Sequence, residues 1–444
     1  MKRILTVAGS DSGGGAGIQA DLKTIALLGG YGMSVVTALT AQNTTGVHGV
    51  HEVPISFIEQ QFDSVLEDIG VDAAKTGMLS SPEIVKLVAR KLRQYRIEML
   101  VLDPVMIAKS GDPLLSNEAR ETLRRELLPL AYIVTPNLPE AEVLTGKRVR
   151  TLKEMKEAAK GIHDMGARYV LVKGGHLKGK AVDILYDGRE AIAFPATRVL
   201  TKNTHGTGCT YSSAIATLIA DEIDIHEAVR RAKVFITEAI VHGISIGKGH
   251  GPTNPYAHFV KELEEYKALK AMEAALEELG IAKVGHLVPE VRSNLGYALS
   301  FARGAGEVLA VPGRITEIGG RMVPASRPTF GASRHVARII LTAMAHDSSI
   351  RAAMNIRYTS QIISVCRRLG LRIASFDRGE EPKGVKEMEG STLEWGTKRV
   401  IDELGEVPDI IYDEGEAGKE PMVRILGRDP EEVVAKVLAI GKGC

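Results

Sequence analysis

The first 250 residues repeat one pattern, and that pattern strongly restricts the fold. A short apolar run is followed by a polar or glycine-rich turn and then by an amphipathic stretch. This alternation is typical of βα units around a mostly parallel sheet. The predicted strands are Ile4–Ala8, Ser34–Leu39, Met99–Leu102, Tyr132–Val134, Tyr169–Val172 and Ala181–Tyr186. The predicted helices, with apolar residues three and four apart, are Ser81–Leu92, Pro139–Thr145, Leu152–Met165 and Ser212–Ala220.

A long amphipathic stretch predicts a domain boundary near residue 255. Asn254 and Pro255 form a favourable helix start, and apolar residues then share one helical face from Phe259 to Leu279. The expected divisions are 1–255, 256–280 as a connecting helix, and 281–444 as a second, smaller α/β domain. In the second domain we expect helices at Arg334–Ala345, Gln361–Leu369, Thr392–Leu404 and Pro430–Ala439, and strands at Val308–Val311, Met354–Ile356, Leu371–Ser375 and Ile410–Tyr412.

Charge and cysteine content narrow the class of protein. The chain carries 56 Lys and Arg against 55 Asp and Glu, so no net positive field favours nucleic-acid or membrane partners. The three cysteines are widely spaced and fit neither a disulfide framework nor a metal motif. No apolar stretch is long enough to cross a bilayer, and the apolar start is too short for a signal peptide. We therefore expect a cytoplasmic protein without membrane or nucleic-acid partners.

The near-zero charge conceals two opposed blocks. Residues 314–378 contain eleven Arg, no Lys and three acids, whereas residues 379–420 contain thirteen acids and five bases. The arginine guanidinium binds phosphate through two parallel hydrogen bonds, so the preference for Arg over Lys favours phosphate recognition. A solvated surface that forms ion pairs with the acidic block is the alternative.

Two glycine-rich turns are candidate ligand sites in the first domain. One runs from Gly9 to Gly17 directly after the first strand, and its alternative reading is a plain flexible turn. The other runs from Asn203 to Thr210 into an apolar helix, where backbone N–H groups suit a phosphoryl group. Cys209 at that helix start is expected to have a lowered pKa, unless it is simply a small buried residue.

Three further polar residues follow predicted strands. Asn137 and Glu140, three residues apart at a helix start, can share one hydrated Mg²⁺, although a helix-capping pair has the same spacing. Lys173 follows another strand, at the sheet edge where α/β proteins bind ligands and where a phosphate could be met.

Taken together, the motifs of residues 1–255 resemble the ribokinase-like hydroxymethylpyrimidine/phosphomethylpyrimidine kinases. The resemblance rests on Ala8–Ser12, Gly15–Asp21, Thr37–Thr44, Lys75–Met78, Asp103–Val105, Thr135–Asn137, Gly206–Cys209 and Gly249–Pro252. It implies a ribokinase-like α/β/α sandwich with a mostly parallel central sheet. It also implies that ATP phosphorylates 4-amino-5-hydroxymethyl-2-methylpyrimidine to the monophosphate and then to the pyrophosphate.

The same resemblance implies a role for individual residues. Gln42 would hydrogen-bond the pyrimidine, and Gly9, Asp21, Met78 and Val105 would line its pocket. Asn137 and Glu140 would organise Mg²⁺, and Lys173 would approach the ATP phosphates. The turn Gly206, Thr207 and Gly208 would bind the transferred phosphate, with Cys209 where most ribokinase relatives carry an Asp base. A thiolate there could accept the hydroxyl proton.

Arginine motifs in the second domain resemble the ThiN-type thiamine-phosphate synthase domain. The matching segments are Pro312–Ile315, Phe330–Arg338, Asn355–Tyr358 and Gly418–Pro421. The family joins the pyrimidine pyrophosphate to thiazole phosphate, and its active Arg and His match Arg314 and His335. Arg327, Arg334 and Arg338 are expected to help bind pyrophosphate. His335 would protonate or bind that group, or play a structural part.

Two other functions remain open. In one, the kinase carries a C-terminal domain that senses a thiamine-related ligand, because ThiN-type domains also occur in regulators; no helix-turn-helix stretch is evident after residue 255. In the other, the first domain is a pyridoxal kinase, which Gln42 and the Gly206–Cys209 turn argue against. In each case we expect small-molecule substrates and a homo-oligomer.

Overall fold

The computed structural model describes residues 1–106, 115–177, 179, 181–382, 391–416 and 418–444. The chain forms two compact units, Met1–Val260 and Lys261–Cys444. The boundary between them falls inside helix α9 (Ala257–Ile281), which covers the amphipathic stretch. Met272, Leu276 and Leu279 of this helix are buried in the core of the second unit. Most of α9 therefore belongs structurally to the second unit.

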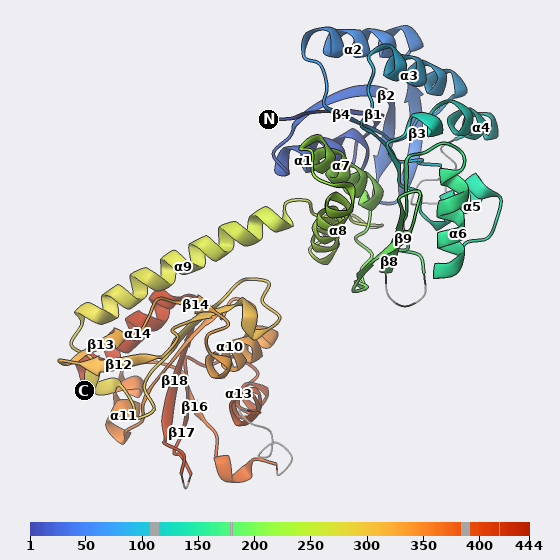
Figure 1. Ribbon diagram of the computed structural model, residues 1–444. Helices are drawn as coiled ribbons and strands as arrows, with labels where there is room; N and C mark the ends of the chain where they lie inside the picture. The colour runs from blue at the N-terminus through green and yellow to red at the C-terminus, as the bar shows by residue number, and fades with distance from the viewer. Residues whose placement is uncertain (107–114, 178, 180, 383–390, 417) are drawn as a thin grey trace. The chain divides into compact units, whose positions relative to one another are not determined.

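The first unit is built on a nine-stranded sheet with the order β3-β2-β1-β4-β5-β6-β7-β8-β9 (Figure 1). Strands β2, β1, β4, β5, β6 and β7 run parallel, and β3, β8 and β9 are antiparallel additions at the two edges. The strands are β1 (Arg3–Asp11), β2 (Tyr31–Asn43), β3 (Gly46–Glu52), β4 (Ala73–Thr76), β5 (Leu100–Leu102), β6 (Ile133–Val134), β7 (Tyr169–Val172), β8 (Ala181–Tyr186) and β9 (Ala191–Ala196). The predicted mostly parallel sheet is confirmed.

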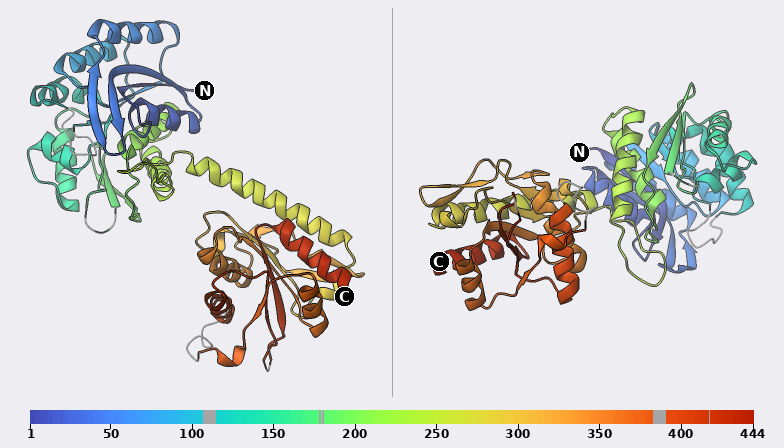
Figure 2. Two further views of the ribbon diagram at one scale, coloured as in Figure 1. Left: turned by 180° about the vertical axis from the view of Figure 1, so that it is seen from behind. Right: turned by 90° about the horizontal axis from the view of Figure 1, so that it is seen from below.

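Helices cover both faces of this sheet, as Figure 1 and Figure 2 show. Alternate side chains of β1 enter the two cores, with Leu5 and Val7 on one face and Ile4 on the other. The first core is covered by α2 (Ile55–Asp68), α3 (Pro82–Gln94), α4 (Asn117–Glu126), α5 (Leu138–Thr145) and α6 (Leu152–His163). The second is covered by α1 (Gly17–Leu27), α7 (Thr207–Ala220) and α8 (Ile225–Val241). This arrangement is the predicted α/β/α sandwich.

The second unit has a seven-stranded sheet with the order β14-β11-β10-β15-β18-β17-β16. Only β16 and β17 pair in parallel; the other pairs are antiparallel. The strands are β10 (Leu295–Ala298), β11 (Val308–Ala310), β14 (Thr329–Phe330), β15 (Ala352–Arg357), β16 (Ile373–Ser375), β17 (Ile410–Asp413) and β18 (Met422–Gly427), and a separate hairpin joins β12 (Ile315–Ile318) to β13 (Arg321–Pro324).

Helices also cover both faces of the second sheet. One core is shared by α9, α11 (Ser360–Arg368) and α14 (Pro430–Gly443), and the other by α10 (Arg334–His346) and α13 (Ser391–Leu404). The second α/β domain expected from the sequence is confirmed. In the described part of the chain, no helix combines the length and apolar character needed to cross a membrane.

Candidate functional site

A cavity of about 700 Å³ opens in the first unit beyond the carboxyl ends of β1, β4, β5 and β7. Ligands of parallel α/β sheets bind at this edge, because the loops that leave the strands gather there. Eleven of the sequence-predicted residues line it: Gly9, Gln42, Met78, Val105, Asn137, Glu140, Lys173, Gly206, Thr207, Gly208 and Cys209. Segments far apart in the sequence therefore meet in one place.

Asp21, expected in the lining, is instead fully buried beneath it. Its carboxylate lies 2.9 Å from Nζ of Lys75, which does line the cavity and is also inaccessible to solvent. Hydroxyl groups of Thr6 and Ser213 donate to the two Asp21 oxygens at 2.6 and 2.7 Å. Burial opposes the charge of Lys75, but the nearby carboxylates prevail and raise its pKa. Asp21 therefore holds the buried Lys75 ammonium group in place at the base of the cavity.

The two glycine turns are in direct contact. Gly206 has a left-handed φ of 77°, and a Cβ there would lie 1.8 Å from the carbonyl oxygen of Gly15. Only glycine therefore fits, on both conformational and steric grounds. Helix α7 begins at the next residue, and its first turn leaves N–H groups without intrahelical partners. The positive end of the helix thus faces the cavity.

Cys209 differs from the sequence-based expectation. It lies in the first turn of α7, where the helix end and Lys75 favour a thiolate. Burial has the larger effect, and it raises the pKa of Cys209 to about 11. The prediction of a lowered pKa is therefore wrong for this structure, and the group at the cavity is a protonated thiol at neutral pH.

Lys173 and Asp103 form a second charged pair in the cavity. Lys173 Nζ lies 2.8 Å from Asp103 Oδ1, and Thr135 donates to the same oxygen at 3.1 Å. Burial opposes the lysine charge, but Asp103 and Glu140 raise the pKa of Lys173, so it remains a cation. A Cβ on Gly208 would lie 3.4 Å from Lys173 Nζ, which brings this charge next to the α7 turn. The turn and the lysine can bind one anion together.

Asn137 and Glu140 form a helix cap. Glu140 N donates to Asn137 Oδ1 at 2.9 Å, and Asn137 N donates to Glu140 Oε2 at 2.7 Å, which is a complete capping box. Burial raises the pKa of Glu140 to about 7, against the effect of Lys173. Among the described residues, no group of three or more His, Cys, Asp or Glu is arranged to hold a metal ion. Glu140 also accepts a hydrogen bond from the Met106 backbone. A carboxylate oxygen retains further lone pairs, so this buried group fits a hydrated cation that also binds ligand phosphates.

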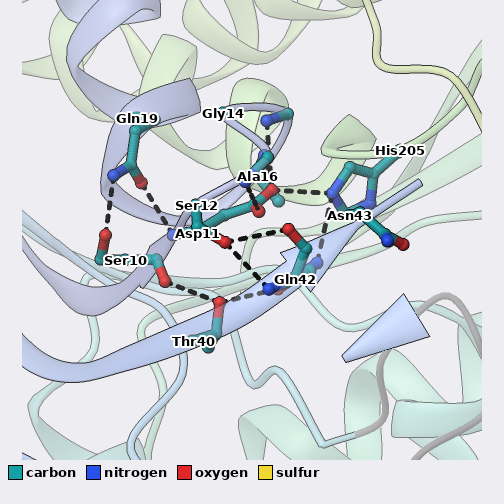
Figure 3. Close-up of polar contacts among 12 residues, drawn as sticks. Ser10, Asp11, Ser12, Gly14, Ala16, Gln19, Thr40, Gln42, Asn43 and His205 are labelled. Atoms are coloured by element: carbon teal, nitrogen blue, oxygen red, sulfur yellow. Dashed lines mark hydrogen bonds and ion pairs between the residues drawn. The ribbon is translucent and has the colours of Figure 1, made fainter. Parts of the chain in front are cut away.

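Asp11 and His205 also belong to this site, although the sequence did not single them out. Asp11 Oδ1 accepts from Gly13 N, and Oδ2 accepts from Gly15 N, Ala16 N and His205 Nε2 at 2.8–3.1 Å (Figure 3). Although burial alone would raise the pKa of Asp11, these hydrogen bonds lower it. One carboxylate thus ties both glycine turns together. The sequence signal that could have identified Asp11 and His205 is the presence of a polar side chain inside each glycine-rich turn.

In the second unit, Arg314 and Arg327 lie on adjacent loops. The Arg314 carbonyl accepts from Ala325 N at 2.9 Å, and Ser326 Oγ donates to the Pro312 carbonyl at 2.8 Å. Arg314 is exposed and has a left-handed φ of 70°, and its guanidinium donates to the Val291 carbonyl. A non-glycine residue in this conformation is strained, which is common at functional sites.

The other predicted residues of the second unit lie at the start of α10. Ser333 caps this helix by accepting from Val336 N, and Arg334, His335 and Arg338 occupy its first turns. Strand β14 lies between this helix start and the loop of Arg327, so the predicted residues form two groups at its ends.

The acidic block forms ion pairs with part of the arginine block. Arg372 lies 2.7 Å from Glu406, and Arg378 and Arg424 both contact the fully buried carboxylate of Asp413 at 2.5 and 2.7 Å. The ion-pair alternative therefore holds for Arg372 and Arg378, whereas Arg424 lies outside the block of residues 314–378. It does not account for Arg314 or Arg327, which are exposed and pair with no acidic side chain among the described residues.

Two family models match the chain. The model for phosphomethylpyrimidine kinase matches residues 11–254, and the model for thiamine-phosphate synthase ThiN matches residues 271–439. The first match contains the whole cavity lining except Ala8, Gly9 and Ser10 of β1. The second contains both groups of predicted arginines.

Curated relatives match the first unit. A thiamine biosynthesis bifunctional protein ThiED of Geobacter sulfurreducens is 57% identical over 252 residues, which is 56% of this chain and 51% of the relative. A hydroxymethylpyrimidine/phosphomethylpyrimidine kinase of Bacillus subtilis is 48% identical over 57% of this chain and 95% of its own length. The chain thus spans about half of the fused relative and nearly all of the single kinase.

Solved structures match the same region. An ADP complex of Bacillus subtilis pyridoxal kinase has a TM-score of 0.56 and 42% identity, and the match covers 59% of this chain and 99% of that one. A phosphomethylpyrimidine kinase from Clostridium difficile is 49% identical with a TM-score of 0.50, over 54% of this chain and all of that one.

Proposed function

Because the chain belongs to the phosphomethylpyrimidine kinase family, we propose that its first unit phosphorylates 4-amino-5-hydroxymethyl-2-methylpyrimidine to the monophosphate and then the pyrophosphate, with ATP as donor. The observation that carries the proposal is the single cavity in which Gln42, Lys173 and the Gly206–Cys209 turn meet. Related kinases bound to ADP support the use of a nucleotide.

In this proposal, substrate binding is divided between polar and apolar residues of the cavity. Gln42 hydrogen-bonds the pyrimidine edge, and Gly9, Met78 and Val105 contact its ring. Asp21 acts from beneath, by holding the Lys75 cation. The ring is thereby placed with its hydroxymethyl group toward the α7 turn.

Phosphoryl transfer is proposed to depend mainly on charge and position. The Gly206–Gly208 turn and Lys173 bind the transferred phosphate through N–H groups and a positive charge that are already in place. Asn137 and Glu140 would hold Mg²⁺, which neutralises phosphate charge when bound. Lys173 can keep its contact with Asp103 and still donate to the phosphate, because an ammonium group has three N–H donors.

Cys209 is the proposed acceptor of the hydroxyl proton. With a pKa of about 11 it is protonated at neutral pH, so it acts as a base only in the small thiolate fraction. We expect Cys209→Ala to lose most of the first phosphorylation, measured as ADP release with the hydroxymethyl substrate. Turnover equal to that of the wild type would exclude Cys209 as the base.

We propose that the second unit condenses the pyrimidine pyrophosphate with thiazole phosphate. The thiazole nitrogen attacks the pyrimidine methylene, the methylene C–O bond breaks, and pyrophosphate leaves with both bonding electrons. Arg314 and Arg327, with Arg334 and Arg338, bind the leaving pyrophosphate, and His335 protonates or binds it.

The full chain tests both activities together. With ATP, Mg²⁺, the hydroxymethylpyrimidine and thiazole phosphate, we expect thiamine phosphate and pyrophosphate as products. Arg314→Ala and His335→Ala should abolish thiamine phosphate while pyrimidine pyrophosphate accumulates. Accumulation of pyrimidine pyrophosphate by the wild type, without thiamine phosphate, would instead favour a ligand-sensing second unit.

We further propose a cytoplasmic homo-oligomer. Light scattering of the purified full chain measures its mass in solution, and a value of 47.8 kDa would contradict assembly.

A further inference from the structure

The hydrogen-bond partners of the Gln42 amide carry information about specificity. Its Nε2 lies 3.3 Å from His205 Nε2, and its Oε1 lies 3.2 Å from Thr40 Oγ1 (Figure 3). Thr40 is 9% exposed and lines the cavity with Gln42 and His205. Each contact needs one donor and one acceptor, so the protons of the two neighbours determine which amide atom belongs on each side.

The proton of His205 is committed to Asp11. Asp11 is 3% exposed, and its Oδ2 lies 2.9 Å from His205 Nε2. The backbone N–H groups of Gly13, Gly15 and Ala16 also donate to this carboxylate, which stabilises its ionised form. An ionised carboxylate accepts only, so His205 Nε2 must carry a hydrogen. A protonated ring nitrogen has no lone pair in the ring plane, so it cannot accept a hydrogen bond from Gln42 Nε2. The atom of Gln42 that faces it should therefore be an acceptor, which shares the hydrogen directed at Asp11.

The proton of Thr40 is committed as well. Its hydroxyl donates to the Ser10 carbonyl at 2.9 Å, within the sheet pairing of β1 and β2. A hydroxyl has one hydrogen, so Thr40 Oγ1 can offer only a lone pair to Gln42. The atom of Gln42 on this side should therefore be a donor. Turning the amide by 180° about its last side-chain bond satisfies both neighbours at once.

We propose that Thr40, His205 and Asp11 are positioning residues that lock the Gln42 amide with Nε2 toward Thr40 and Oε1 toward His205, and so make the cavity selective for an aminopyrimidine. The proposal rests on the proposed function, in which Gln42 contacts the pyrimidine. A 4-aminopyrimidine presents an N–H donor beside a ring-nitrogen acceptor, and a 4-oxopyrimidine presents the reverse order. An amide of fixed orientation can pair with only one of these two edges. The ring cannot turn over to present its other side, because its hydroxymethyl group must still reach the α7 turn.

The test compares two substrates with the full-length enzyme. We measure kcat/KM for the first phosphorylation of 4-amino-5-hydroxymethyl-2-methylpyrimidine and of its 4-oxo counterpart. The wild type should prefer the amino substrate at least about 100-fold, because a mismatched edge leaves polar groups unpaired. Thr40→Val should narrow this preference by about 10-fold, chiefly by improving the 4-oxo substrate. Thr40→Ser retains the hydroxyl and should retain the preference.

His205→Gln provides an independent second variant. The imidazole of His205 can only donate toward Gln42, whereas a Gln amide can either donate or accept there. The preference for the amino substrate should therefore again fall by about 10-fold. Thr24→Val is the matched control, because this buried threonine of α1 donates only within its own helix, to the Ala20 carbonyl at 2.8 Å. Its preference should equal that of the wild type.

Each outcome has a distinct meaning. If Thr40→Val and His205→Gln lose activity on both substrates equally and keep the wild-type preference, these residues do not orient Gln42, and the inference is overturned. If the wild type phosphorylates neither pyrimidine, the proposed function itself fails. A preference that collapses in both variants and survives in Thr40→Ser and Thr24→Val supports the inference.

Discussion

In the first unit, the buried ion pairs lie beside the cavity. In the second unit, the buried ion pairs lie apart from the arginines that are candidates for ligand binding. Lys75 and Lys173 both line the cavity while paired with Asp21 and Asp103. In the second unit, the buried charges gather around Asp413 on β17. Strand β11 leads to Arg314, and three strands separate it from β17 in the sheet. Four spacings of ~4.8 Å therefore place the axes of β17 and β11 about 19 Å apart.

This difference distinguishes two uses of charge. A buried cation beside a cavity is already desolvated and pre-positioned, so a ligand phosphate gains much of the interaction without new ordering. Exposed arginines interact more weakly with a single anion, because water screens them and their side chains must be ordered. Under the proposed function, the first unit would hold its charges ready for the ligand, and the second would rely on several arginines acting together.

The largest expected effect concerns the contact between the two glycine turns. Gly206→Ala places a Cβ 1.8 Å from the Gly15 carbonyl, so we expect kinase activity to fall at least about 100-fold. Gly146→Ala is the control, since it has a similar φ of 68° but no atom within 4 Å of the added Cβ. It should cost about 1 kcal/mol of stability and leave activity unchanged. Near-normal activity of Gly206→Ala would show that the turn is not rigidly held.

The second prediction tests the buried charges of the second unit. Asp413→Asn removes the partner of two buried guanidinium groups, so this unit should lose about 3–5 kcal/mol of unfolding free energy. Urea unfolding of the full chain measures the loss, and kinase activity should persist at low urea. Asp402→Asn, which breaks a pair with Lys398 between exposed side chains, should cost about 0.5 kcal/mol or less. Equal effects of the two variants would contradict the structural role of Asp413.

The third prediction concerns pH and the raised pKa of Glu140. Its pKa of about 7 in the folded protein lies above the ordinary 4.5, so folding takes up a proton between these values. Stability contributed by the neutral carboxyl is complete below about pH 4.5 and is lost as pH rises through about 7. Glu140→Gln keeps an oxygen for the cap and stays neutral, so its Tm should rise relative to the wild type between pH 5 and pH 8.

Glu154→Gln is the control for this pH effect. Glu154 forms the same type of capping box at the start of α6 but is only half-buried, and its hydrogen bonds lower its pKa. No gain relative to the wild type is expected for this variant as pH rises from 5 to 8. If the Tm of both variants changed with pH as the Tm of the wild type does between pH 5 and pH 8, burial would not control the titration of Glu140.

The smallest expected effect concerns backbone strain at Arg314. Arg314→Gly should raise the unfolding free energy by about 0.5–1 kcal/mol, because glycine adopts the φ of 70° without a Cβ clash, and it should abolish thiamine phosphate formation. Arg96→Gly is the control, with a φ of 52° on the first unit and outside the cavity lining. It should show a similar gain in stability while both activities persist. If Arg314→Gly lowered the unfolding free energy, the contacts of the Arg314 side chain would stabilise the protein by more than the backbone strain destabilises it.

Most of the first fold could be predicted because its parallel strands are continuous buried apolar runs, such as Leu100–Leu102 and Tyr169–Val172. Strand β3 (Gly46–Glu52) could not, because it is an exposed edge strand with little apolar periodicity. Strand β14 is only two residues long. Helix α2 was also missed, although its buried residues Ile58, Phe62 and Leu66 recur every four residues.

Prediction of the site followed a similar division. Glycine turns and strand ends can be recognised in a sequence because their conformational requirements are local. This is how Lys173 and the Gly206–Cys209 turn were found, whereas Gln42 was identified through the family resemblance. Asp11 and His205 are 194 residues apart, and no local pattern relates them. The pKa of Cys209 was predicted in the wrong direction, because a helix end is visible in the sequence and burial is not.

The sequence by itself determined the mostly parallel sheet of βα units, the order of the glycine turns and the motifs of the two family resemblances, because periodicity and turn chemistry depend on neighbouring residues. The α/β/α sandwich was expected from the first of those resemblances. Only the tertiary structure decided that Asp21 lies under the cavity rather than in its wall, and that Asp11 and His205 join the two turns. Desolvation and hydrogen-bond direction depend on every group packed around an atom. Those groups come from distant parts of the chain, so they exist as neighbours only after folding.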